Sequence, residues 1–161
     1  MVDMRELRDV LLTQNRIKER HTVEREATGK LRELADTPFI VVVKGVRRAG
    51  KSTLMADLLD DDSYFVNFDD ERFVDFGVGD FQRMVELLVE LFGVRHRFFF
   101  DEIQNVPGWE RFVRRLHDQG EKVFVTGSNS SMLSRELGTH LTGRNVTLEL
   151  FPFSFREFLR M

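Results

Sequence analysis

The sequence contains no cysteine among its 161 residues. Disulfide bonds and thiolate metal sites are therefore excluded. It also lacks any apolar run that approaches the roughly 20 residues of a membrane-spanning helix. Its first residues, MVDMRELRDVLLTQ, lack the long apolar core of a signal peptide. We therefore expect a soluble, cytoplasmic protein that does not insert into a membrane.

A strong excess of charge of one sign is missing as well, because 24 basic residues stand against 27 acidic residues and the net charge is −3. This balance does not point to a nucleic-acid-binding protein, but it is compatible with a local basic patch, so nucleic-acid binding stays open. Hydrophobic residues make up 42% of the chain, which at this length is enough to build the core of about one domain.

Strand and helix patterns alternate along the chain. Residues 4–35 carry apolar residues at helical spacing in two blocks. Five strands are expected after them, separated by helices, at residues 39–44, 64–68, 97–101, 122–128 and 145–151. This alternation predicts right-handed crossovers and an α/β fold of three layers, with a parallel sheet between helices. We expect an N-terminal helical segment at residues 1–36 and a core domain at residues 37–161.

The segment GVRRAGKS at residues 45–52 has the G-x-x-x-x-G-K-[ST] spacing of a phosphate-binding loop between a strand and a helix. Gly45 and Gly50 allow the backbone N–H groups to point inward, toward the positive end of the next helix. We expect Lys51 to reach the β- and γ-phosphates of ATP, and the Ser52 hydroxyl to ligate Mg²⁺. The other positions predicted to bind the nucleotide are Val46, Arg47, Arg48, Ala49 and Thr53. For the two arginines, contact with phosphate, with a partner subunit or with water alone fits the pattern equally well.

Two adjacent acids, Asp101 and Glu102, follow the apolar run FFF at the end of the third expected strand. Ligands of parallel sheets bind beyond the carboxyl ends of the strands, so these acids are expected beside the phosphate loop. We expect Asp101 to hold Mg²⁺, directly or through water, and Glu102 to orient and deprotonate the water that attacks the γ-phosphate. A solvated acidic pair at a strand end is the alternative interpretation.

The fourth expected strand ends in polar residues that are candidates for sensing the nucleotide. Ser128 is the first choice for a contact with the γ-phosphate or the attacking water, and Asn129 is the second. A turn that uses Gly, Ser and Asn for backbone reasons explains the same residues without any catalytic role.

Six stretches of the chain together resemble one protein family. They are, in order, GVRRAGKST, NFDDERF, FFFDEIQNVPGWERFVRRLHDQG, VFVTGSNSSMLSREL, LTGR and LFPFSFREFL. Over roughly residues 20–161 they resemble the archaeal and bacterial AAA-type P-loop ATPases whose ATPase core precedes a C-terminal nuclease-like domain of unknown function. The resemblance implies a RecA/AAA-like fold of the ASCE type, with a five-stranded parallel sheet in the order 5-1-4-3-2.

The resemblance also implies ATP and Mg²⁺ as cofactors. Lys51, Ser52, Asp101 and Glu102 match the family positions, and Thr53 matches the usual second hydroxyl. Arg144, in LTGR, stands where AAA-type ATPases place an arginine that stabilises the γ-phosphate, often in a neighbouring subunit. A structural ion pair is the alternative for this arginine.

The C-terminal residues contain a capping box, SFRE, which predicts a helix that begins after Ser154 and has Glu157 in its first turn. An apolar group surrounds this box and has no evident cover. Because members of the family continue into further domains, we expect the chain to be a truncated core. We further expect the apolar group to mediate self-association or to dock a missing C-terminal domain. Its members are Phe151, Phe153, Phe155 and Phe158.

The function predicted from these residues is that of an ATP-binding module that hydrolyses ATP with Mg²⁺. A nucleotide-dependent regulatory switch with little turnover is one alternative. A small-molecule P-loop kinase is another, although such kinases usually lack a glutamate directly after the Mg²⁺ aspartate and carry an arginine-rich lid. A GTPase is disfavoured, because no D-x-x-G follows the third strand and no N-K-x-D motif is present.

Overall fold

The computed structural model describes residues 1–16, 25–128 and 130–160 of the chain. Its centre is one parallel sheet with the strand order β2-β3-β4-β1-β5. Read from the other edge, this is the predicted order 5-1-4-3-2, which is therefore confirmed. The strands are β1 (Ile40–Lys44), β2 (Ser63–Asn67), β3 (Arg97–Asp101), β4 (Lys122–Gly127) and β5 (Asn145–Glu149).

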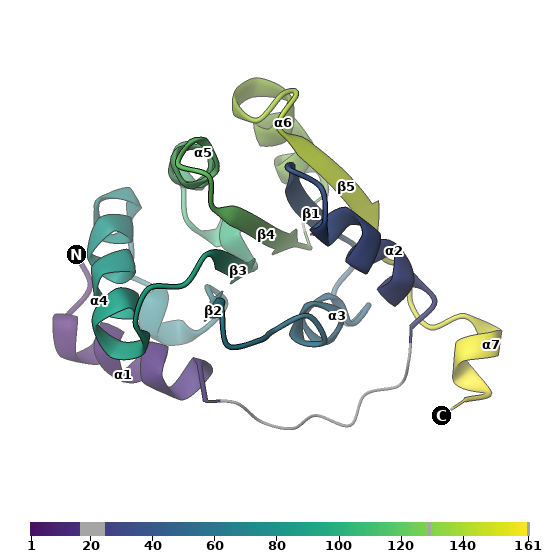
Figure 1. Cartoon of the computed structure of the whole chain (residues 1–161), viewed down its shortest axis with the longest axis horizontal. Helices are drawn as coiled ribbons and strands as arrows, with labels where there is room; N and C mark the ends of the chain where they lie inside the picture. Colours follow the sequence, from purple (N-terminus) through teal and green to yellow (C-terminus); the bar gives the residue numbers. More distant parts are fainter. Residues whose placement is uncertain (17–24, 129, 161) are drawn as a thin grey trace.

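Helices cover both faces of the sheet, as Figure 1 shows, so the predicted three-layer α/β architecture is confirmed. One face carries α1 (Met4–Gln14), α4 (Phe81–Phe92), α5 (Trp109–Asp118) and α6 (Ser130–His140). The other carries α2 (Ala27–Ala35) and α3 (Lys51–Ala56). Short 3-10 turns lie in the connections, at Glu71–Phe73, Val78–Asp80 and Ile103–Asn105. None of the helices in the described ranges has the length and apolar character that a membrane crossing needs.

The phenylalanine run of β3 divides between the two faces of the sheet, because successive side chains of a strand point in opposite directions. Phe98 and Phe100 belong to the cluster under α1, α4 and α5. Phe99 belongs to the cluster under α2 and α3, where it stacks on Phe124 with ring centroids 4.3 Å apart. Both faces of β3 are therefore buried, and so is Asp101 at its end.

The outer edge of β2 is closed by the end of α1. The Asn15 carboxamide donates to Phe65 O and accepts from Phe65 N, both at 2.8 Å. The Gln14 carboxamide does the same with the backbone of Asn67, at 3.1 and 2.9 Å. Two side chains thus replace a neighbouring strand, which protects an edge that would otherwise be open to pairing with another chain.

Candidate functional site

The phosphate loop follows β1 and leads directly into α3. Gly50 has φ +90°, in the left-handed region that favours glycine. At Gly45 a Cβ atom would collide with the carbonyl oxygen of Leu150, just after β5. Both glycines of the motif are thus required, one by its conformation and the other by a close backbone approach.

A cavity of about 480 Å³ opens beside this loop, at the carboxyl ends of the strands. It is lined by Arg47, Arg48, Gly50, Lys51, Ser52, Thr53, Asn67, Asp69, Asp101 and Glu102. The loop, the end of β2 and the acids after β3 therefore meet in one place, as the sequence predicts for a nucleotide site.

Lys51 is buried, with only 4% of its side chain exposed. Its Nζ donates to the carbonyls of Gly45 and Val46, at 2.8 and 2.9 Å, and lies 3.9 Å from Glu102 Oε1. The ammonium group is therefore held between the loop and the acid. The ammonium group of Lys51 is therefore in place at the loop before a phosphate binds.

Asp101 lies at the end of β3, where two hydroxyl groups bond its carboxylate. Ser52 Oγ donates to one oxygen and Thr126 Oγ1 to the other, both at 2.5 Å. Burial raises the pKa of Asp101 and the nearby Glu102 raises it further, whereas the two hydroxyl groups and Lys51 lower it, so that the net shift is upward. A cation at this carboxylate would favour its charged form.

Mg²⁺ binds hard oxygen ligands and usually keeps several waters, so one or two protein ligands suffice. Ser52 and Asp101 offer a hydroxyl and a carboxylate side by side, which fits this requirement. The described residues contain no group of three or more histidines and acids that could hold a metal by themselves. The donor set thus suits an ion that arrives with a nucleotide.

Glu102 sits in the turn after β3 with φ 53°, a conformation that is uncommon for a residue other than glycine. Its Oε2 accepts hydrogen bonds from Ser128 N at 3.2 Å, Ser128 Oγ at 2.9 Å and Gln104 Nε2 at 2.6 Å. Its own N–H donates to Thr126 Oγ1 at 3.0 Å. Ser128 therefore contacts the second acid, whereas its predicted contact with the γ-phosphate or the attacking water stays a prediction.

Gln104 and Thr126 take part in this network, and the sequence patterns did not single out either for such a role. Gln104 is 6% exposed and lies in the 3-10 turn Ile103–Asn105, and Thr126 is fully buried on β4. Thr126 is one of the polar residues at the end of the fourth expected strand, but Ser128 and Asn129 are preferred to it as candidates. For Gln104 no spacing rule gives a comparable signal.

The other predicted loop residues take different positions. Arg47 lies 3.4 Å from Asp69 in an exposed ion pair, so its guanidinium already has a partner on the cavity wall. Arg48 has φ 63° and also lines the cavity. Val46 is 58% exposed, while Ala49 is buried in the cluster under α2 and α3. Thr53 lines the cavity from the first turn of α3.

Arg144 does not lie at the phosphate-loop cavity of its own chain. It directly precedes β5, and its carbonyl accepts from Ile40 N at the amino end of β1, the edge of the sheet opposite the phosphate loop. Its guanidinium lies 3.5 Å from Asp118, which is the ion pair foreseen as the alternative. A role in a neighbouring subunit stays a prediction. Asn129 lies outside the described residues.

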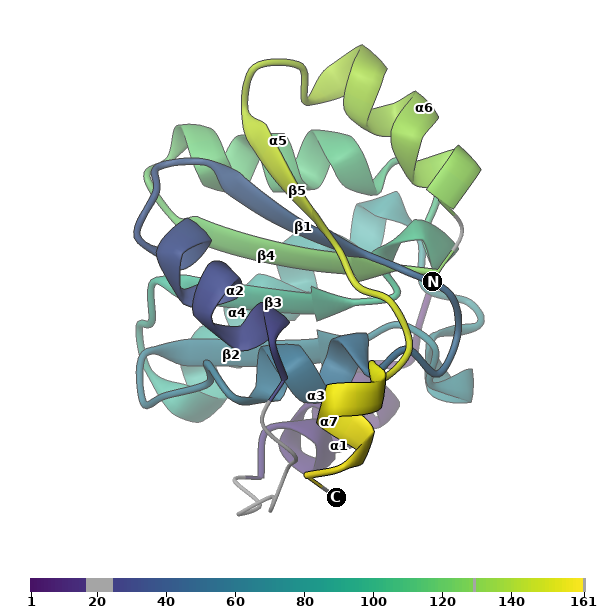
Figure 2. The same cartoon turned by 90° about the vertical axis from the view of Figure 1, so that its right-hand side faces the viewer.

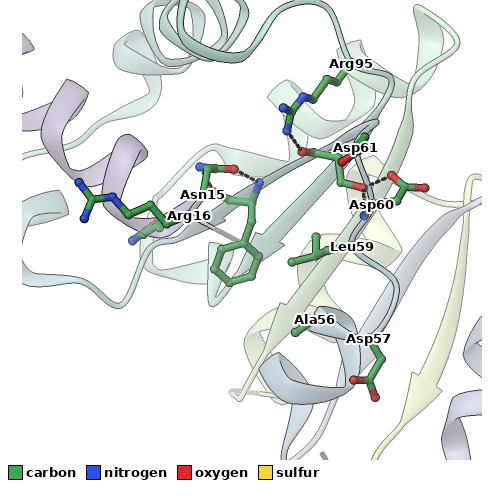
Figure 3. A pocket seen from close by; sticks show the side chains of 11 residues that line it. Asn15, Arg16, Ala56, Asp57, Leu59, Asp60, Asp61 and Arg95 are labelled. Carbon is green, nitrogen blue, oxygen red and sulfur yellow. Dashed lines mark hydrogen bonds between the residues drawn. The ribbon is translucent and has the colours of Figure 1, made fainter. Parts of the chain in front are cut away.

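A second cavity, of about 410 Å³, lies between the end of α1 and the α3–β2 connection (Figure 3). Several of its polar groups are used in structural bonds. Arg95 Nη1 donates to Ser63 O at 2.8 Å, Asp60 accepts from Ser63 Oγ at 2.7 Å, and Asn15 bonds the backbone of β2. None of the residues predicted to bind a nucleotide lines it, so the cavity beside the phosphate loop is the candidate functional site.

Comparison with known proteins shows the family to which the chain belongs. A family model described as an AAA domain matches residues 37–159, which is most of the chain. The chain belongs to the AAA domain family. The match confirms the predicted AAA-type P-loop ATPase family, whereas the expected C-terminal nuclease-like domain stays a prediction.

Two curated relatives match this AAA domain chain, and both are described as uncharacterized proteins. One, from Methanocaldococcus jannaschii, is 39% identical over 125 residues, covering 75% of this chain and 28% of the relative. The other, from Haemophilus influenzae, is 35% identical over 142 residues, covering 81% of this chain and 35% of the relative. The chain thus spans about a third of the length of the curated relatives it matches.

Among solved structures, domain III of the replication initiation protein DnaA from Thermotoga maritima is similar to this chain. The TM-score is 0.53 and the sequence identity 14%, and the match covers 84% of this chain and 67% of that one. At 14% identity this similarity shows a shared fold and nothing about function. Family and fold together support an ATP-binding module of the AAA type.

Proposed function

We propose that this AAA domain binds ATP and hydrolyses it with Mg²⁺. One observation carries the proposal. The buried Lys51, the Ser52–Asp101 pair and Glu102 converge in a single cavity beside the phosphate loop. Phosphoryl transfer needs positioning and charge compensation more than covalent chemistry, and these groups supply both.

Each group has a distinct role in the proposal. The loop N–H groups and Lys51 bind the β- and γ-phosphates, while Ser52 and Asp101 would hold Mg²⁺, which neutralises the charge on the phosphate oxygens when bound. Glu102 orients a water molecule toward the γ-phosphate and takes its proton. Ser128 bonds the Glu102 carboxylate and thereby holds it in a defined orientation.

Calorimetric titration with ATP and Mg²⁺ tests the binding half of the proposal. Lys51→Ala removes the cation held at the loop, and we expect its ATP affinity to fall at least about 30-fold, or about 2 kcal/mol. Lys30→Ala is the matched control, because Lys30 is 60% exposed on α2 and pairs only loosely, at 3.6 Å, with Glu33. A Lys51→Ala protein that binds ATP like the wild type would contradict the proposal.

Phosphate release measured on the same proteins tests the hydrolysis half. A wild-type chain that binds ATP but releases no phosphate above the Lys51→Ala background would show a nucleotide-dependent switch instead of an ATPase. Transfer of the γ-phosphate to an added small molecule, without release into water, would show a kinase.

A further inference from the structure

Arg25 and Glu157 are 132 positions apart in the sequence and form a buried ion pair. Arg25 Nε lies 2.7 Å from Glu157 Oε2, and the two side chains are only 4% and 5% exposed. Burying two charges is expensive unless their geometry is good and their remaining hydrogen-bonding groups are satisfied. The hydrogen-bond partners of the two side chains therefore show which segments of the chain the pair joins.

The carboxylate of Glu157 joins two segments of the chain. Its Oε2 accepts from Glu26 N, at the start of α2, and its Oε1 from Ser154 N, both at 2.9 Å. The second bond belongs to the predicted capping box of α7 (Phe155–Phe158), which the structure contains. Burial alone would raise the pKa of Glu157, but these hydrogen bonds and the contact with Arg25 outweigh it and lower the pKa to about 2.

The guanidinium of Arg25 joins a third segment, the phosphate loop itself. Nη1 donates to Ala49 O and Nη2 donates to Phe151 O, both at 2.7 Å. The ring of Phe153 lies against the guanidinium, with its centroid 4.2 Å from Cζ. All three guanidinium nitrogens thus have a partner, one on the phosphate loop and two on the residues after β5.

The contact with Ala49 bears on how the loop binds phosphate. A loop that turns its N–H groups toward a phosphate must turn carbonyls elsewhere, and a buried carbonyl needs a donor. Arg25 is that donor for Ala49. It packs so closely that a Cβ atom on Gly50 would lie 2.8 Å from Nη1. The guanidinium therefore supports the loop at the turn into α3.

We propose that Arg25 is a positioning residue of the phosphate loop, and that its ion pair with Glu157 couples nucleotide binding to docking of the C-terminal segment, residues 151–160. The inference rests on the proposed binding of ATP. In Figures 1 and 2, α7 lies away from the centre of the sheet and reaches the body of the molecule through the segment after β5. The side chains of Phe151, Phe155 and Phe158 are mostly exposed. The ion pair and the hydrogen bonds that Glu26 N and Arg25 donate to this segment therefore carry much of the docking.

Coupling of this kind is reciprocal. If docking of the C-terminal segment tightens ATP binding by some factor, ATP must stabilise the docked segment by the same factor. A side chain that only supports the fold does not respond to ATP in this way. The two directions can be measured separately, one as an affinity and the other as protection of backbone amides.

The experiment combines calorimetry with amide hydrogen exchange. In the wild type, we expect ATP with Mg²⁺ to slow exchange in residues 151–160. Glu157→Gln removes the charge of the pair, and we expect it to weaken ATP binding about tenfold and to abolish this slowing. Arg25→Lys keeps the charge but cannot reach Glu157, Ala49 and Phe151 together, so we expect a similar loss. Glu33→Gln, which removes an exposed carboxylate of α2, is the control.

Several outcomes would overturn the inference. One is that the Glu157→Gln and Arg25→Lys proteins fold and bind ATP as tightly as the wild type. Another is that ATP leaves amide exchange in residues 151–160 of the wild type unchanged. This second measurement does not depend on the folding of any variant. A wild-type chain that binds no ATP would overturn the proposed function together with this inference. Unchanged affinities in variants of an ATP-binding wild type would overturn the inference alone.

Discussion

Gln104 donates from its Nε2 to Glu102 Oε2 at 2.6 Å. The same carboxylate oxygen accepts two bonds from Ser128, and the other oxygen lies 3.9 Å from Lys51 Nζ. The two oxygens of Glu102 therefore have different tasks in the proposed reaction. Oε2 accepts the bonds that orient the side chain, and Oε1, on the side of Lys51, is the oxygen that we propose takes the proton from water.

Replacing Glu102 by glutamine should separate binding from hydrolysis. A carboxamide of the same shape can keep the hydrogen bonds that Glu102 Oε2 accepts, but it cannot take a proton. We expect Glu102→Gln to bind ATP within about twofold of the wild type and to lower kcat by about 10²–10⁴-fold. Steady-state phosphate release and calorimetry on the same preparation check both halves. Hydrolysis at the parental rate would place the base elsewhere.

Shortening Gln104 to alanine should lower turnover without weakening nucleotide binding. Gln104 is 6% exposed and donates to Glu102, the proposed base. Gln104 Oε1 accepts no hydrogen bond from any described residue, so the bond to Glu102 is the side chain's principal polar contact. We expect kcat to fall about tenfold, which corresponds to one lost hydrogen bond to a charged group. The exposed amide Gln82, on α4, supplies the control Gln82→Ala.

The charge of a side chain at position 104 should move the pH profile of the reaction. Gln104→Glu would place a second carboxylate beside Glu102, and like charges raise each other's pKa. We expect the acidic limb of the kcat profile to shift to higher pH in this variant. A Gln104→Glu profile that coincides with the wild type would show that residue 104 does not act on the base.

Stability in acid should depend on the Arg25–Glu157 pair. The folded pKa of Glu157 is lowered from 4.5 to about 2, so the folded state favours the ionised form. The resulting contribution to the free energy of unfolding is complete above the unfolded value of 4.5 and is lost as pH falls through 2. Urea unfolding between these values should show the advantage of wild type over Glu157→Gln shrinking as pH falls. Ser154→Ala keeps the carboxylate, so its deficit relative to wild type should not follow this trend.

Arg144 should influence turnover only when a second copy of the chain is present. It lies at the edge of the sheet opposite its own phosphate loop, so any contact with a γ-phosphate has to occur in a neighbour. We expect specific activity to rise with protein concentration, and Arg144→Ala to lower turnover far more than binding, by up to about 10³-fold. Arg114→Ala is the matched control, because Arg114 also pairs with Asp118, at 3.8 Å.

Sedimentation should accompany this assay. Self-association of the chain through its exposed aromatic residues, of which Phe155 is 77% exposed, is the prediction that supplies the neighbour. A monomer at all concentrations, with activity strictly proportional to enzyme and insensitive to Arg144→Ala, would contradict both expectations.

Much of the fold and part of the site follow from local patterns. The phosphate loop is defined by residues close together in the sequence, namely the buried run of β1, Gly45, Gly50 and Lys51. Their spacing is therefore enough to predict the geometry of the loop. Asp101 could be placed as well, because the carboxyl ends of parallel strands meet at one edge. The strand order came from the family resemblance, and the structure confirms it.

Short-range chemistry was enough to predict the phosphate loop, the two acids at the end of β3 and the capping box at Ser154. The bond from Gln104 to Glu102, the place of Arg144 at the far edge of the sheet and the link from Arg25 to Glu157 and the loop became visible only in the folded chain. Periodicity and spacing describe neighbours along the chain. A contact across 132 residues depends on how the helices and strands pack, and no pattern within one segment specifies it.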